Sequence, residues 1–362
     1  MRKLVSIRKI HKIEQIPYYP ALSEYHVDGW TIVDQSCKYK EGELVVFFEP
    51  DTALPVDPRF EFLPVVDVDG EKRHLITVQK IRGKYSQGII LPLEMFPEIR
   101  NPCEGMPVAD IIGAEKYEPS NIANTSYVKK GDFPAFLIKS DQPRIQDFPQ
   151  YFTEFYDSEF EETEKIDGTS VTIYLHRGEF GICAREYEVN IPESPKYIGV
   201  MVASKINLEK AMRQVGDNFA VQCEGIGPNI QVKLYPYPYS TLFVYDIIDT
   251  TTVKKLPPAE RMEIYNNLFG TLQKINTKKV AKYFGHVPVL RPSVKIFHEC
   301  PTIEKLLSHA DGQSVITNAP REGLVYKGVN VPISFKAISN KYLVEVIYPR
   351  ADAKKNKNTH IS

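Results

Sequence analysis

Short runs of hydrophobic residues, separated by polar turns, dominate the first 120 or so residues of the chain. The runs are LVSIRKI, GWTIVDQ, GELVVFFEP, HLITVQKI and SQGIILPL, and turn clusters such as KYKEGE and DVDG lie between them. Runs of this length that are rich in Val, Ile and aromatic residues are typical of β-strands. Several short strands at such spacing predict a small barrel or sandwich.

The pattern changes over residues 117–164. This stretch contains several prolines, a group of aromatic residues between Phe148 and Phe160, and the acidic run DSEFEETE. We interpret it as a connection between two domains, with the second domain beginning near residues 125–135. The predicted domains are therefore residues 1–125 and 126–362.

Strands and helices alternate after residue 165. An apolar and polar alternation on both sides of Arg177–Glu179 predicts a hairpin. Two segments predict helices, one with proline near its start and one with Thr302 as a candidate N-cap. The second domain is therefore expected to be mixed α+β with largely antiparallel sheets. The expected strands are SVTIYLH, GICAREYEV, FAVQCEGIG, TLFVYDII, GLVYKG and ISFKAI, and the expected helices are LPPAERMEIYNNLFGTL and PTIEKLLSHA.

Composition limits the classes of protein that remain. A length of 362 residues is enough for about two domains, each with its own core. Lys and Arg total 45 against 46 for Asp and Glu, so a nucleic-acid partner requires a local basic face. No apolar run approaches the ~18 residues of a membrane span. The five cysteines show no CxxC spacing, and the basic N-terminus has no apolar core of a secretory signal. We therefore expect an intracellular protein, in cytoplasm or nucleus.

The sharpest chemical motif is Glu164-Lys165-Ile166-Asp167-Gly168. A lysine becomes a nucleophile only when it is deprotonated, so it needs burial or nearby positive charge. Phosphoryl transfer also needs acidic groups that hold a metal and cations that neutralise phosphate. An exposed surface turn is the alternative interpretation of this motif taken alone.

Further motifs follow in a fixed order. They are Arg185, Glu224 in QCEGIGPNIQ, the aromatic strand Phe243-Val244-Tyr245-Asp246-Ile247, Arg321-Glu322-Gly323-Leu324-Val325-Tyr326-Lys327, and Ser334-Phe335-Lys336. This series resembles the covalent nucleotidyltransferase superfamily of polynucleotide ligases and mRNA capping enzymes. The shared features are a KxDG motif, a glutamate-glycine strand, an FDI-like strand, an EGLVYK-like strand and a closing lysine strand.

The position of the β-rich region narrows this resemblance. DNA ligases and capping enzymes of the superfamily typically carry an OB-fold after the last lysine motif, whereas only about 20 residues follow Lys341. The β-rich region lies in front of Lys165 instead. The chain therefore resembles ATP-dependent RNA ligases with an N-terminal OB-like domain, as do the stretches EGELVVFFEPDTALP, RGKYSQGIILPL, FLIKSDQPRIQ and SFKAISNKYL. The resemblance implies an OB-like β-barrel followed by a mixed, mainly antiparallel, ATP-grasp-like nucleotidyltransferase domain.

The resemblance also implies a reaction and a set of residues for it. Lys165 would attack the α-phosphate of ATP, and the AMP would pass to a 5′-phosphate that a 3′-OH then attacks. The expected partners are RNA ends, in a nicked duplex with RNA on the 3′-OH side, and the expected cofactors are ATP with Mg²⁺ or Mn²⁺. The residues expected to bind the nucleotide are Glu164, Ile166, Arg185, Glu224, Tyr245 or its strand neighbour Phe243, Lys327 and Lys336, and Asp167 and Glu322 are the expected metal ligands.

Two positions depart from the family pattern. Ser334 stands where many relatives have a first lysine, and Glu186-Tyr187 follows Arg185 where RNA ligases often have asparagine.

Outside the motifs, Lys80, Arg82, Lys84 and Lys341 are candidates for contact with RNA, with a solvated loop as the alternative at the first three. We expect a monomer. The alternatives to an RNA ligase are a DNA ligase, an mRNA guanylyltransferase, and a nucleic-acid-binding module without catalysis.

Overall fold

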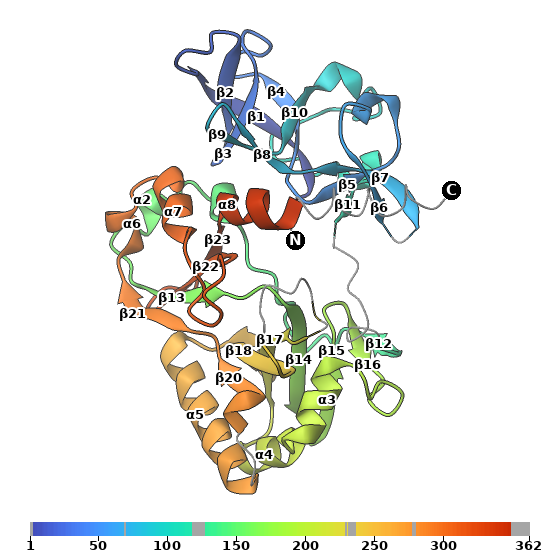
Figure 1. Ribbon diagram of the computed structural model, residues 1–362, viewed down its shortest axis with the longest axis vertical. Helices are drawn as coiled ribbons and strands as arrows, with labels where there is room; N and C mark the ends of the chain where they lie inside the picture. Colours follow the sequence, from blue (N-terminus) through green and yellow to red (C-terminus); the bar gives the residue numbers. More distant parts are fainter. Residues whose placement is uncertain are drawn as a thin grey trace.

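The computed structural model describes residues 3–68, 70–117, 127–228, 230, 237–276 and 280–348 (Figure 1). A β-rich N-terminal region lies at one end of the long axis, and a larger α+β region lies at the other. The predicted domain boundary at residue 125 lies outside the described residues, as does the C-terminal tail. No helix of the described ranges is long and apolar enough to cross a membrane.

Two small antiparallel sheets and the two-stranded β8–β9 hairpin build the N-terminal region. The first has the strand order β10-β4-β1-β2-β3, and the second has the order β11-β5-β7-β6. β4 is buried on both faces, because Val46 and Phe48 pack into one core cluster while Val45 and Phe47 pack into another. This explains the unbroken run LVVFF. The elements are β1 (Val5–Gln15), β2 (Leu22–Val27), β3 (Trp30–Gln35), β4 (Leu44–Phe48), β5 (Thr52–Leu54), β6 (Val65–Val68), β7 (Glu71–Ile76), β8 (Val78–Ile81), β9 (Lys84–Gln87), β10 (Ile89–Pro92), β11 (Glu115–Lys116), α1 (Ala109–Ile112) and the 3-10 turns Pro58–Phe60 and Leu93–Met95.

An eight-stranded sheet forms the larger half of the C-terminal region, in the order β12-β16-β15-β14-β17-β18-β19 with β20 parallel to β18. The predicted hairpin is β14–β15, and its turn residues Arg177 and Gly178 both have positive φ, as the tight turns of such hairpins require. Helices α3, α4 and α5 cover one face (Figure 1). The elements are β12 (Lys129–Asp132), β14 (Thr169–His176), β15 (Glu179–Cys183), β16 (Tyr187–Val189), β17 (Phe219–Ile226), β18 (Thr241–Asp249), β19 (Lys254–Lys255), β20 (Phe284–His286), α3 (Ile198–Lys205), α4 (Leu208–Val215), α5 (Pro258–Ile275) and the 3-10 turn Val280–Lys282.

A second, four-stranded sheet with the order β21-β13-β22-β23 packs against short helices. Its elements are β13 (Phe160–Lys165), β21 (Val289–Val294), β22 (Gly323–Gly328), β23 (Ser334–Ile338), α2 (Tyr151–Glu154), α6 (Ile296–Glu299), α7 (Ile303–Ala310) and the 3-10 turn Ile145–Asp147. α8 (Asn340–Tyr342) and a π-helical turn (Leu343–Ile347) follow, and they pack against the β8–β9 hairpin of the N-terminal region.

The predicted fold class, an OB-like β region followed by an antiparallel α+β region, is confirmed. Both predicted helices form, α5 with Pro258 in its first turn and α7 with the Thr302 hydroxyl accepting a hydrogen bond from the Lys305 amide. The other helices were missed, and α3 and α4 are the longest of them. The α3 segment IGVMVASK is nearly uniformly apolar and has no helical period, whereas α4 is amphipathic and was overlooked.

The assignment of the acidic run to a connection is wrong, because it contains β13, a strand buried along most of its length. Its acids are neutralised locally. Arg261, fully buried, donates two hydrogen bonds of 2.7 Å to the carboxylate of Glu161, and Arg291 pairs with Glu162.

Candidate active site

A pocket lies where the two sheets of the C-terminal region meet the N-terminal region. It is lined by residues of β13, β14, β17, β18, β22 and β23, by Asp51, Lys116 and Tyr117 of the N-terminal region, and by Leu343 and Ile347 of the last helical turn. Most of the predicted site residues line it, namely Glu164, Lys165, Ile166, Asp167, Arg185, Glu224, Tyr245, Glu322, Lys327 and Lys336.

Lys165 is the last residue of β13. It pairs in register with Gly323, so Glu322 lies beside it just before β22 begins. The Lys165 Nζ donates a hydrogen bond of 2.6 Å to Glu322 Oε2. Only glycine fits at Gly168, the last position of the KxDG motif, because a Cβ atom there would lie 2.4 Å from the Gly225 carbonyl oxygen. This close approach brings the start of β14 against β17, the strand that carries Glu224.

Carboxylates crowd the lysine. Burial disfavours the ammonium form of Lys165, but Glu322 and Glu224 outweigh burial and raise the pKa of Lys165 above its ordinary value. Burial, and to a lesser extent the charges of Glu322 and Asp167, disfavour the ionised form of Glu224. Lys165 favours that form but does not outweigh them, so the pKa of Glu224 is raised to about 8. Three carboxyl groups, those of Asp167, Glu224 and Glu322, thus act on the one ammonium group of Lys165.

Asp167 is oriented by a residue that the sequence analysis did not assign. The buried Tyr342 of α8 donates a hydrogen bond of 2.7 Å from its hydroxyl to Asp167 Oδ2. The only signal in the sequence was that Tyr342 belongs to SFKAISNKYL, one of the family-like stretches.

One wall of the pocket is suited to a flat apolar group. Tyr245 lines it, whereas Phe243 does not, although both belong to one cluster with Ile166. Burial raises the pKa of the Tyr245 hydroxyl, which therefore stays neutral. Glu164, which is buried, accepts a hydrogen bond of 2.9 Å on Oε2 from the Val315 amide, while its Oε1 is buried and has no hydrogen-bond partner.

The lysines predicted to contact phosphate have different surroundings. Lys327 donates to Asp246 and to the Tyr245 carbonyl, and burial lowers the pKa of Lys327 to about 8 although Asp246 opposes that change. Lys336 lines the pocket from β23. Ser334, at the position that departs from the family pattern, donates from its hydroxyl to Gln142 Oε1 at 2.5 Å.

Arg185 lines the pocket and donates to Asp141 Oδ1 at 2.7 Å. Across the pocket, Arg144 pairs with Asp51 at 2.6 Å and thereby joins the wall to the N-terminal region. The sequence analysis assigned no function to Arg144, Asp51 or Lys116, although FLIKSDQPRIQ, which contains Arg144, was noted as family-like.

The predicted RNA-contacting residues do not line the pocket. Lys84 forms an ion pair of 2.9 Å with Glu24. Lys80 lies over the ring of Tyr85, and the Arg82 guanidinium lies 5.0 Å from the ring centre of Tyr19. Lys341 is exposed on α8.

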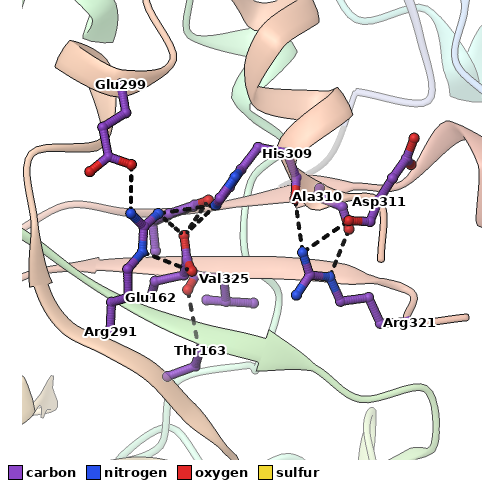
Figure 2. Close-up of polar contacts among 10 residues, drawn as sticks. Glu162, Thr163, Arg291, Glu299, His309, Ala310, Asp311, Arg321 and Val325 are labelled. Atoms are coloured by element: carbon purple, nitrogen blue, oxygen red, sulfur yellow. Dashed lines mark hydrogen bonds and ion pairs between the residues drawn. The ribbon is translucent and has the colours of Figure 1, made fainter. Parts of the chain in front are cut away.

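A polar cluster supports the far side of β13 (Figure 2). Glu162 accepts hydrogen bonds from Arg291, from the Tyr326 hydroxyl at 2.9 Å and from His309 Nε2 at 2.9 Å. Burial is outweighed by His309, Arg291 and Tyr326, so the pKa of Glu162 falls to about 2. In the same view, Arg321 reaches the end of α7.

Only one group of three potential metal ligands within the described ranges has all its ligand atoms within 4.8 Å, namely His11, Asp28 and Glu104. It lies outside the pocket, and its acids already pair with Arg8 and Lys9. The carboxylate oxygens of Asp167, Glu224 and Glu322 do not all lie within 4.8 Å of one another.

Known protein families match both regions of the chain. A profile described as RNA ligase matches residues 158–340, and a profile described as an OB-fold domain matches residues 4–93. No curated protein matches the chain.

Solved structures of Naegleria gruberi RNA ligase match nearly the whole chain. The structure with pyrophosphate is 33% identical over 97% of this chain and 100% of that chain, with a TM-score of 0.87. A lysine-to-methionine variant with AMP and Mn is 33% identical over 94% and 98%, with a TM-score of 0.85. A lysine-to-alanine variant with ATP and Mn is 33% identical over 94% and 97%, with a TM-score of 0.85. The predicted enzyme class is confirmed: the chain belongs to the RNA ligase family and carries an OB-fold region in front of its ligase domain.

Proposed function

We propose that the protein joins a 3′-OH end to a 5′-phosphate end of a nicked duplex, with RNA on the 3′-OH side, through a lysyl-AMP intermediate on Lys165. One observation carries this proposal: the Lys165 amine lies in a pocket that Asp167, Glu224, Glu322 and Lys336 also line. The relatives solved with ATP, AMP, pyrophosphate and Mn support ATP as the nucleotide and Mn²⁺ or Mg²⁺ as the cation.

Three in-line displacements at phosphorus make up the reaction. In the first, the neutral Lys165 Nζ attacks the α-phosphorus of ATP, the N–P bond forms, and the bond to pyrophosphate breaks. In the second, an oxygen of the RNA 5′-phosphate attacks the lysyl-AMP phosphorus and releases the lysine. In the third, the 3′-OH attacks the 5′-phosphorus, loses its proton and releases AMP. Positioning and charge neutralisation dominate such steps.

The residues around Lys165 fit a divalent cation. They are hard oxygen donors, and burial together with repulsion from Glu322 and Asp167 raises the pKa of Glu224, so a cation there would be favoured. Asp167 and Glu322, with Glu224, would hold the cation, partly through water because their ligand atoms are not gathered within 4.8 Å. When bound, such a cation neutralises phosphate charge and lowers the pKa of a nearby ammonium group.

Preference for adenine over guanine is assigned to Glu164. Its Oε1 is a buried acceptor without a hydrogen-bond partner, and Glu164 lines the pocket together with Tyr245 and Ile166. The N6 amino group of adenine can donate to this oxygen, whereas the O6 carbonyl of guanine would repel it. Tyr245 would stack on the base, and Arg185 would contact the ribose or the RNA end. Lys336, assisted by Lys327, would neutralise the α-phosphate.

RNA outside the pocket is expected to contact cations of the N-terminal region. Arg82 and Lys80 each lie over a tyrosine ring, an arrangement suited to both phosphate and base contact. Lys84 is a weaker candidate because Glu24 already neutralises it, and Lys341 remains a candidate on α8.

A label-transfer assay tests the proposal. The protein is mixed with ATP labelled in the α-phosphate and with Mg²⁺ or Mn²⁺, beside Lys165→Ala and a GTP control. A cation-dependent labelled band that is absent from Lys165→Ala supports lysyl-AMP, and a band with GTP alone would indicate a guanylyltransferase. Nicked duplexes with RNA or DNA at the 3′-OH side then distinguish the proposed ligase from a DNA ligase. No band with either nucleotide, from folded protein free of bound AMP, would leave a binding module.

A further inference from the structure

The loop between α7 and β22, residues 311–322, contacts both the expected base site and the nucleophile. At its middle, the Val315 amide donates to Glu164, and Ile316 packs in the cluster that contains Tyr245 and Ile166. At its end, Glu322 accepts the hydrogen bond from Lys165. One short segment therefore contacts both Glu164, which is expected to recognise the base, and Lys165, the proposed nucleophile.

Arg321 fastens this loop, as Figure 2 shows. Its guanidinium donates to the carbonyl oxygens of His309 at 2.8 Å, Ala310 at 2.9 Å and Asp311 at 3.0 Å, and its amide donates to the Gly312 carbonyl at 3.0 Å. The first three carbonyls belong to the end of α7, where a helix leaves such groups without partners and favours a cation.

Hydrogen bonds within the loop also connect its middle to its ends. Ser314 is buried, its amide donates to the Ala319 carbonyl at 2.7 Å, and its hydroxyl accepts from the amide of Ile316 at 3.1 Å. At the base of the loop, Ser339 donates from its hydroxyl to Asp311 and from its amide to the Glu322 carbonyl. Release of the Arg321 end would therefore loosen both the Val315 contact and the carboxylate beside Lys165.

We infer that Arg321 is a positioning residue and that the 311–322 loop couples adenine recognition at Glu164 to the position of Glu322 beside Lys165. This inference rests on the proposed function, since it assigns the unpartnered Glu164 Oε1 to the N6 amino group of the nucleotide. Adenine bound to Glu164 would fix the carboxylate that accepts a hydrogen bond from the Val315 amide and so fix the position of the loop. The loop would in turn keep Glu322 beside Lys165. A nucleotide without the amino group would lose both effects.

The test compares ATP with purine riboside triphosphate, which lacks the 6-amino group, in lysyl-nucleotide formation. A hydrogen bond to a charged acceptor predicts that the wild-type protein prefers ATP about tenfold or more. Arg321→Lys keeps the charge but not the planar fork that reaches three carbonyls, and its preference for ATP should fall to about twofold. Val315→Pro removes the amide that orients Glu164 and should have the same effect.

Matched controls separate this outcome from loss of stability. Val315→Ala keeps the amide, and 64% of Val315 is exposed, so its preference should be unchanged. Arg213→Lys alters another arginine in the last turn of a helix, where it donates to the Gly178 carbonyl at 2.9 Å, and should also leave the preference unchanged.

If Arg321→Lys and Val315→Pro slow lysyl-nucleotide formation equally with both nucleotides, the inference is overturned and Arg321 has only a structural role. If Arg321→Lys does not fold, Val315→Pro against Val315→Ala decides the matter. A wild-type protein that is labelled equally by the two nucleotides would also overturn the inference while leaving the ligase proposal intact. A wild-type protein that ATP does not label would overturn the proposed function itself.

Discussion

Lys165 and Glu322 are separated by 157 positions in the chain, yet their side chains form a hydrogen-bonded ion pair of 2.6 Å. The antiparallel pairing of β13 with β22 produces this contact, because it aligns Lys165 with Gly323. The pair holds the lysine in its unreactive ammonium form. For Lys165 to act as the proposed nucleophile, the negative charge of Glu322 has to be neutralised.

Replacement of Glu322 by glutamine should slow lysyl-AMP formation by about 100-fold, since it removes a charged group from the reaction centre. It should also displace the rise of rate with pH to lower pH, because Glu322 raises the pKa of Lys165. Label transfer measured between about pH 7 and 11, a range that includes the ordinary lysine pKa of about 10.4, follows both effects. Glu299→Gln, at an exposed position outside the pocket, is the matched control, and an unshifted pH profile in Glu322→Gln would contradict the prediction.

Cation binding should release a proton from Glu224. Its pKa is raised to about 8, so the group is largely protonated near neutral pH, and a bound cation favours the ionised form. The affinity for Mn²⁺ should therefore increase with pH up to about 8 and then level off. Calorimetric titration just below neutral pH, in buffers of different ionisation heat, counts the protons. Heats independent of the buffer would argue against this, and Glu224→Gln should release none.

Loss of the Tyr342 hydroxyl should weaken cation binding about tenfold, because Asp167 would lose the group that orients it. The dependence of lysyl-AMP formation on Mn²⁺ concentration measures the effect of Tyr342→Phe. Tyr326→Phe removes a comparable buried hydroxyl from the far side of β13 and should leave this dependence unchanged. A similar change in both variants would show that Tyr342 affects stability alone.

Removal of one partner from the buried pair of Arg261 and Glu161 should be strongly destabilising. Arg261→Met leaves Glu161 as an uncompensated buried charge, which costs about 3–5 kcal/mol of unfolding free energy. Urea unfolding followed by circular dichroism measures the loss. The double variant Arg261→Met with Glu161→Leu should recover most of it, and no recovery would show that the pair acts mainly through packing.

Acid should destabilise the protein partly through Glu162. Its pKa lies at about 2 in the folded protein against an ordinary value of 4.5, so its stabilisation is complete above about pH 4.5 and is lost as the pH falls toward 2. At about 1.4 kcal/mol for each pKa unit, this contributes about 3 kcal/mol. Glu162→Gln should therefore flatten the dependence of unfolding free energy on pH in this range. An equally steep dependence in the variant would rule out this carboxyl as a source.

The order of motifs along the chain was by itself enough to predict the enzyme class, RNA ligase. Lys165, Asp167, Glu224, Glu322 and Lys336 were assigned to one site from the sequence, because nucleotidyl transfer needs these residue types and the motifs identify them. Strand alternation likewise predicted the β14–β15 hairpin, since hydrophobic period and turn residues are local properties of the chain.

Only the tertiary structure decided what surrounds these residues. The acidic run of β13 resembles a solvated connection until Arg261 and Arg291, contributed by distant segments, neutralise it. Tyr342 and Arg321 lie in family-like stretches, but their neighbours in sequence do not show what they contact, because each acts through hydrogen bonds to residues distant from it in the fold or at the end of a helix. The ionisation of the site residues also depends on the tertiary structure. The pKa values of Lys165 and Glu224 are set by burial and by charges that only folding brings together.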